Sequence, residues 1–142
     1  MFRKILVPTD GSELSVDAAL RAVPLARLTN ASITVLFVQD TYPYTGIGQA
    51  NAAGLQAYMA AAREQGMAAV DRIRDAAAAE GVAIDTKVIE NSQAAKGIVE
   101  AAQESGADLI LMGSHGRSGL ARLMLGSVAA KVLALSAVPV LV

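Results

Sequence analysis

The stretch that decides the fold is ILVPTDGSELSVDAALRAVPLARLT, residues 5–29. It begins with an apolar run at residues 5–7, which Pro8 ends, and this pattern predicts a short buried strand. A helix is predicted over residues 12–29, because small apolar side chains recur there at helical spacing. Pro24 falls inside this helix and predicts a kink or a break. The stretch is therefore a strand followed directly by a helix.

The same alternation continues to the end of the chain. Strands are predicted at 33–38, 84–89, 109–112 and 138–142, and helices at 55–80, 92–105 and 128–135. Gly81 and Gly106 predict helix ends, and Ser92 predicts the N-cap of the third helix. Strands that alternate with helices predict an α/β fold with a parallel sheet covered on both faces, and the near-continuous apolar strands agree.

One domain over residues 1–142 is expected, because no repeat, linker or composition shift divides the chain. The one irregular insertion, Asp40 to Gly54, predicts a long loop that serves as a lid, as a partner surface or simply as a mobile connection.

Composition excludes several classes of protein. Twelve basic and 13 acidic residues leave a net charge of −1, which argues against a nucleic-acid-binding surface. The absence of cysteine excludes disulfides and zinc–thiolate sites. No run approaches the roughly 18 apolar residues of a membrane span. The apolar run near the start of the sequence is too short for a secretory signal. A cytoplasmic protein without membrane insertion is expected.

A glycine-rich connection, GSHGRSGLARLMLGS at residues 113–127, follows the fourth predicted strand. Glycine loses more conformational entropy on folding than any other residue, so four glycines in one connection need a reason. Gly113 and Gly116 predict tight turns that expose backbone N–H groups, and Gly126 opens a helix whose first N–H groups are unpaired. A phosphate fits such a place. Ser127 is predicted to cap this helix, to donate its hydroxyl to a phosphate, or both.

Ligands of parallel α/β sheets bind beyond the carboxyl ends of the strands. The segments richest in groups for a polar ligand are residues 8–12 after the first strand and the glycine-rich connection after the fourth. Two familiar motifs are excluded: no glycine precedes a lysine as in a P-loop, and no G-x-G-x-x-G follows an early strand.

The combined motifs resemble the nucleotide-binding branch of the universal stress protein family. The glycine-rich connection has the spacing G-x2-G-x9-G-S, formed by Gly113, Gly116, Gly126 and Ser127. The resemblance covers the whole chain and includes ILVPTDGS at 5–12, ADLILMGSHG at 107–116, GSVA at 126–129 and PVLV at 139–142.

The resemblance implies a Rossmann-like sheet of order 3-2-1-4-5, in which Asp10 and Gly113 meet across one crevice that binds ATP, ADP or AMP. Asp10 would accept from a ribose hydroxyl, Val38 would contact adenine, and Gly126 to Val128 would hold the distal phosphates, bridged by Mg²⁺ or Mn²⁺. The implied nucleotide-binding residues are Pro8, Thr9, Asp10, Val38, Met112, Gly113, Ser114, His115, Gly116, Arg117, Gly126, Ser127 and Val128.

Some residues depart from the family pattern or allow another interpretation. Asn91 and Gln93 stand where the family often has Gly and Pro, and Phe37 replaces a frequent His. Asp10 could instead cap the first helix in a capping box with Glu13. These alternatives stay open at the level of sequence.

Three functions remain. The leading one is a nucleotide-binding stress-response or regulatory protein. The resemblance implies that it forms a homodimer through residues 138–142, because members of the family pair this strand antiparallel with its copy. The alternative for this strand is that a loop of the same chain covers it. The second is a slow ATPase or an autophosphorylating protein that uses Ser114 or Ser127, although no general base is evident. The third is a nucleotide-independent dimeric interaction module.

Overall fold

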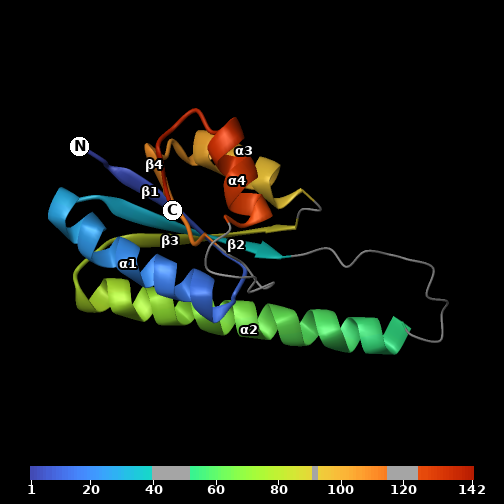
Figure 1. The fold of residues 1–142 in the computed structure, drawn as a ribbon. Helices are drawn as coiled ribbons and strands as arrows, with labels where there is room; N and C mark the ends of the chain where they lie inside the picture. The colour runs from blue at the N-terminus through green and yellow to red at the C-terminus, as the bar shows by residue number, and fades with distance from the viewer. Residues whose placement is uncertain (40–51, 91–92, 115–124) are drawn as a thin grey trace.

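The computed structural model describes residues 1–39, 52–90, 93–114 and 125–142. They form a five-stranded sheet of order β3-β2-β1-β4-β5, and each pair of neighbouring strands is parallel (Figure 1). The elements are β1 (Lys4–Thr9), α1 (Glu13–Thr29), β2 (Ser32–Gln39), α2 (Ala52–Ala79), β3 (Ile84–Glu90), α3 (Ala94–Ser105), β4 (Leu109–Leu111), α4 (Ser127–Leu135) and β5 (Val140–Leu141). The predicted Rossmann-like α/β fold and its strand order are confirmed.

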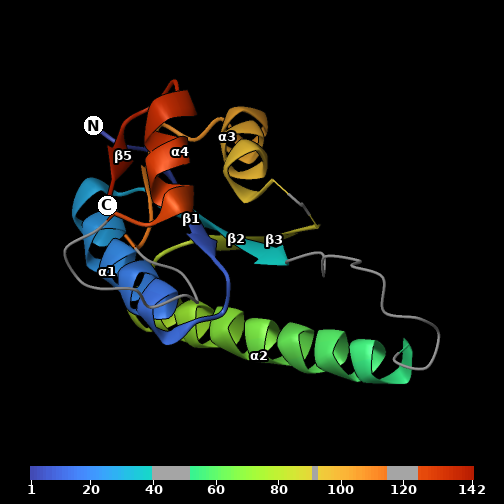
Figure 2. The ribbon, with the colours of Figure 1, turned by 45° about the vertical axis from the view of Figure 1, so that its right-hand side comes forward.

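Alternate residues of the central strands enter two separate cores, one on each face of the sheet. Helices α1 and α2 lie on one side of the sheet, and α3 and α4 lie on the other (Figures 1 and 2). Val7 and Phe37 pack in the core with α1 and α2, whereas Leu6 and Leu36 pack in the core with α3 and α4. Because both faces of β1 and β2 are buried, apolar residues occupy consecutive positions.

The third strand departs from this pattern. β3 lies at one edge of the sheet, and its residues alternate between half-buried and exposed positions. Val88 is 47% exposed. β3 still contacts both cores, through Ile84 on the α1 and α2 face and Ile89 on the α3 and α4 face, but as an edge strand it is less buried than β1 and β2.

The predicted end of the first strand is also wrong, because Pro8 lies inside β1 and is paired in register with Leu36. The Lys4 carbonyl accepts from the Asp108 N–H, so even-numbered residues of β1 direct their backbone groups toward β4. The pairing of β1 with β4 ends at Leu6. Pro8 follows that point, so its missing N–H removes no bond from the described ladder.

Helix α1 continues through Pro24 as one 17-residue helix, so the predicted break does not occur. Pro24 lies on the exposed side of α1. Water can therefore hydrate the carbonyl that loses its helical partner. Asn30 ends the helix in a left-handed conformation, with φ 57°.

Helix α2 begins three residues earlier than predicted, since Ala52 to Gly54 are helical. Alanine favours a helix strongly enough to tolerate the one glycine. Residues 40–51, the rest of the predicted loop, lie outside the described residues. The first half of α2 projects past the carboxyl ends of β2 and β3 (Figures 1 and 2). Gly81 follows its end with φ 69°, as predicted.

The N-cap of α3 is Gln93, whose side chain makes no cap bond. The predicted cap, Ser92, precedes this position and lies outside the described residues. Gly106 ends α3 in a left-handed conformation, as predicted. Within the described segments, every helix is too short or too polar to cross a membrane.

Candidate functional site

The site predicted from the sequence lies where two neighbouring strands end. β1 pairs directly with β4, so the residues that follow them emerge at the same edge of the sheet. Asp10 follows β1, and Gly113 and Ser114 follow β4. The observed strand order thus brings these two segments to one edge, as predicted.

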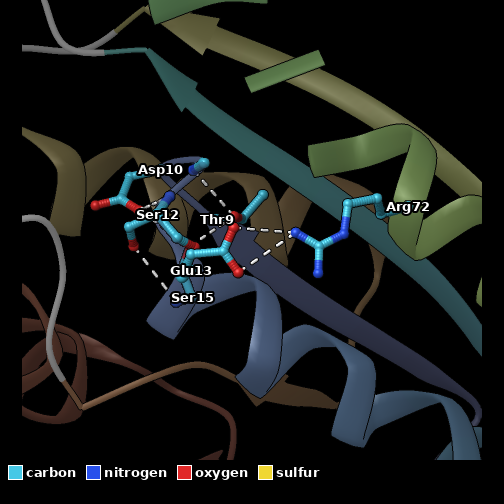
Figure 3. Close-up of polar contacts among 7 residues, drawn as sticks. Thr9, Asp10, Ser12, Glu13, Ser15 and Arg72 are labelled. Atoms are coloured by element: carbon cyan, nitrogen blue, oxygen red, sulfur yellow. Dashed lines mark hydrogen bonds and ion pairs between the residues drawn. The ribbon is translucent and has the colours of Figure 1, made fainter. Parts of the chain in front are cut away.

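At the β1–α1 junction, side chains satisfy the start of the helix (Figure 3). Ser12 is the N-cap of α1, and its hydroxyl accepts from the Ser15 N–H at 3.4 Å. Asp10 Oδ1 accepts from the Ser12 N–H at 2.9 Å and from the Ser15 hydroxyl at 3.0 Å. Asp10 therefore belongs to the turn before the helix, and Ser12 is the capping residue.

The capping box that Asp10 and Glu13 could form is not present. The Glu13 carboxylate instead pairs with Arg72 of α2 at 3.1 Å, away from the Asp10 carboxylate (Figure 3). Both partners are largely exposed, so the ion pair contributes little to stability.

Gly11 is the residue that lets the turn pass close to α2. Its φ is 84°, in the left-handed region that side chains rarely adopt. A Cβ on Gly11 would also lie 3.1 Å from the Gly66 Cα. In turn, a Cβ on Gly66 would lie 2.0 Å from the Phe37 ring. The turn, α2 and the end of β2 are thus packed directly against one another through two glycines.

Two predicted ligand residues, Val38 and Met112, have their side chains in the core. Each is 7% exposed, and both belong to the core cluster on the α3 and α4 face. The Met112 N–H donates to the Leu141 carbonyl at 3.0 Å. The Val38 side chain is therefore part of the core, and Met112 anchors the start of the glycine-rich connection.

The β4–α4 junction is built differently from the β1–α1 junction. The Gly126 N–H donates to the Ser114 carbonyl at 2.6 Å, which ties the start of α4 to the end of β4. Gly126 is the N-cap of α4 and supplies no side-chain cap. Ser127 is thus the first helical residue, and the prediction that it caps the helix is wrong. Ser127 and Val128 are exposed at this end of α4.

The backbone of Gly126 does not itself require glycine. Its φ of −61° and ψ of 152° are accessible to any residue. Among the described glycines, positive φ values occur at Gly11, Gly81 and Gly106. The left-handed turn that would require glycine is thus not found at Gly113 or at Gly126.

Three of the predicted nucleotide-binding residues, His115, Gly116 and Arg117, lie outside the described residues. The site can therefore be described from Pro8, Thr9 and Asp10 on one side and from Gly113, Ser114 and the start of α4 on the other.

Sequence reasoning missed Gln39, the last residue of β2. It is 7% exposed, and among the described residues, which pause after this position, its Oε1 is a buried acceptor with no hydrogen-bond partner. Nothing in the apolar pattern marks this position, because a single glutamine at a strand end is usually solvated.

Sequence reasoning also missed Asp108, which lies at the amino-terminal ends of β1 and β4, opposite the predicted site. Its carboxylate accepts from the N–H groups of Arg3 at 2.9 Å and Lys4 at 3.0 Å. Partial burial alone raises the pKa of Asp108, but these backbone donors and the positive N-terminus hold the pKa below its ordinary value. Asp108 thereby fastens the start of β1 to the start of β4.

Within residues 1–39, 52–90, 93–114 and 125–142, no group of three histidine or acidic side chains is arranged to hold a metal ion.

Comparison with known proteins agrees with this fold. The universal stress protein family model matches residues 1–142. The universal stress protein MJ0531 of Methanocaldococcus jannaschii is 37% identical over 142 residues, which cover 100% of this chain and 82% of that protein. The universal stress protein YxiE of Bacillus subtilis is 36% identical over 147 residues, which cover 100% of this chain and 99% of that protein.

A solved universal stress protein in complex with cAMP is similar with a TM-score of 0.70 and 27% identity, over 99% of this chain and 95% of that chain. The match over the full length and the identity to both relatives show that this chain belongs to the universal stress protein family.

Proposed function

We propose that this universal stress protein binds an adenine nucleotide, ATP above all, between the loops after β1 and β4, and acts as a regulatory module of a stress response. The observation that carries the proposal is the start of α4. Its N-cap residue, Gly126, supplies no side-chain cap, and the bond from the Gly126 N–H to the Ser114 carbonyl holds this helix end at the edge where β1 also ends. The N–H groups of a first helical turn and the helix dipole favour a phosphate there.

The choice of glycine at the N-cap of α4 supports the same proposal. Serine, aspartate or asparagine at this position would stabilise the helix more than glycine does. The φ of Gly126 does not demand glycine, and the missing Cβ would let a ligand approach the backbone closely.

The proposed ligand has a part for each side of the site. Asp10 would accept from a ribose hydroxyl, Val38 would meet adenine through its backbone, and the first turn of α4 would meet the phosphates. Mg²⁺ would be held by the phosphates of the nucleotide. The related structure in complex with cAMP supports an adenine nucleotide as the ligand class.

A calorimetric titration of protein freed of bound ligand tests this proposal. Mg-ATP, AMP and cAMP are each titrated into the wild type and into Gly126→Val. We expect micromolar ATP binding that the substitution abolishes, and weaker AMP binding. The matched control is Gly54→Val, since a Cβ at Gly54 meets no atom within 4 Å. If the wild type binds none of the three nucleotides, the proposal is overturned.

We further propose that two copies associate through β5. β5 is the outer strand on one side of the sheet, and there Leu141 is 51% exposed and Val142 is 47% exposed. The Pro139 and Leu141 carbonyls accept from β4, so the backbone groups of Val140 face outward. Val140→Pro would remove an outward donor and keep the β4 ladder. Sedimentation velocity is expected to show a dimer for the wild type and a monomer for the variant.

A further inference from the structure

Ser15 belongs to a partly buried group of polar side chains at the β1–α1 junction (Figure 3). Its side chain is on the first turn of α1, and Ser15 is only 7% exposed. Its hydroxyl lies 2.7 Å from Thr9 Oγ1, 3.0 Å from Asp10 Oδ1 and 2.9 Å from the Ser12 carbonyl. One serine therefore touches three of the residues that build the turn.

The hydrogen-bond donors give this group a direction. Thr9 Oγ1 already accepts from the Gly11 N–H at 3.1 Å. Its own proton is then best directed to Ser15 Oγ, which leaves the Ser15 proton for Asp10 Oδ1 or the Ser12 carbonyl. Hydroxyl bonds of this kind to a carboxylate are charge-assisted and strong.

The same Asp10 oxygen also accepts from the Ser12 N–H at 2.9 Å. The two donors reach Oδ1 from the helix and from the turn, so they restrict rotation of the carboxylate about its terminal bond. A carboxylate that is fixed before ligand binding loses less entropy when it accepts from a hydroxyl.

We infer that Ser15 is a positioning residue, which orients the Asp10 carboxylate toward the vicinal hydroxyls of a ribose. This inference rests on the proposed function and goes beyond it, because Ser15 would act on the sugar through Asp10 without touching the nucleotide.

The test uses ligand pairs that differ only in the sugar. Mg-ATP and Mg-2′,3′-dideoxy-ATP are titrated into the wild type, Ser15→Ala and Ser15→Thr. We expect Ser15→Ala to weaken ATP binding about fivefold, the effect of losing one such hydrogen bond. The loss for dideoxy-ATP is expected to stay within about twofold, and Ser15→Thr is expected to restore ATP binding.

Ser12→Ala is the matched control. It removes the cap hydroxyl from the same turn but keeps the Ser12 N–H that binds Asp10. Any effect on binding should be equal for the two nucleotides. Thermal unfolding of each variant checks that the fold is retained.

Three results would overturn the inference. Equal loss for ATP and dideoxy-ATP in Ser15→Ala would make Ser15 a structural residue. Wild-type protein that binds both nucleotides equally would leave the proposed function standing and remove the role of the ribose. Wild-type protein that binds neither would end the proposed function and this inference together.

Discussion

The β1–α1 and β4–α4 junctions lie at the same edge of the sheet, but they satisfy the first turn of their helices in opposite ways. At the β1–α1 junction the chain supplies its own partners, through the Ser12 cap and the bonds from Ser12 and Ser15 to Asp10. At the β4–α4 junction Gly126 supplies no side-chain cap.

The difference indicates a division of labour. The self-capped junction is packed against α2 through Gly11 and presents a carboxylate in a fixed position. At the β4–α4 junction Gly126 contributes no cap of its own, and in the proposed function a ligand anion would meet this positive helix end. A first turn that gives up local stability in this way is expected where a ligand completes the structure.

The largest effect is expected when the second junction is converted into a copy of the first. Gly126→Asp would place a capping carboxylate at the start of α4. We expect ATP affinity to fall by about 100-fold, or about 2.7 kcal/mol, because the carboxylate occupies the donors and repels phosphate. The unfolding free energy should rise by a few tenths of a kcal/mol. Calorimetry measures the ATP affinity, and urea unfolding measures the free energy of unfolding. A variant that binds ATP as tightly as the wild type would contradict the proposed difference between the two junctions.

The next effect concerns the packing that keeps the first junction rigid. Gly66→Ala would place a Cβ 2.0 Å from the ring of Phe37, which is 1% exposed and cannot move aside. We expect a loss of about 1–3 kcal/mol in unfolding free energy. Urea unfolding measures it, with Gly54→Ala on the same helix as the control.

At Gly54 the same methyl group meets no atom within 4 Å, so helix propensity alone should raise stability by up to about 1 kcal/mol. Equal effects at the two glycines would show that α2 does not press on Phe37.

Much of this architecture follows from local pattern. Apolar runs or alternating apolar residues predict the five strands, and Gly81 and Gly106 predict helix ends, because these signals depend on residues close in sequence. The strand order came from the resemblance, since periodicity does not say which strands are neighbours.

Long-range contacts were not predictable in this way. The contact of Gly66 with Phe37, the burial of the Gln39 side chain and the bonds from Arg3 and Lys4 to Asp108 each depend on how distant segments meet. The N-cap of α4 is a similar case: serine is the better cap, yet Gly126 holds that position, and its N–H bonds to the Ser114 carbonyl at the end of β4.

A smaller effect is expected from removing the cap of the first junction. Ser12→Ala should lower the unfolding free energy by about 1 kcal/mol, because the hydroxyl that accepts from the Ser15 N–H is lost. Thermal or urea unfolding measures the change. ATP affinity should stay within about twofold of the wild type, since the N–H that binds Asp10 is kept. A large loss of affinity would mean that the cap hydroxyl itself takes part in binding.

The smallest effect is expected at Asp108, which fastens together the two strands that carry the junctions. Asp108→Asn keeps one oxygen acceptor at a partly exposed position, so the loss at neutral pH should be about 0.5 kcal/mol. The folded-state pKa of Asp108 is lowered, so its carboxylate stabilises the fold above the pKa of the unfolded chain. This contribution is lost as the pH falls through the lower folded-state pKa. Urea unfolding from pH 7 down to the acid range should therefore show the wild type and Asp108→Asn converging at low pH. A difference that does not depend on pH would mean that the two strands are held by the shape of the side chain, and that its charge contributes nothing.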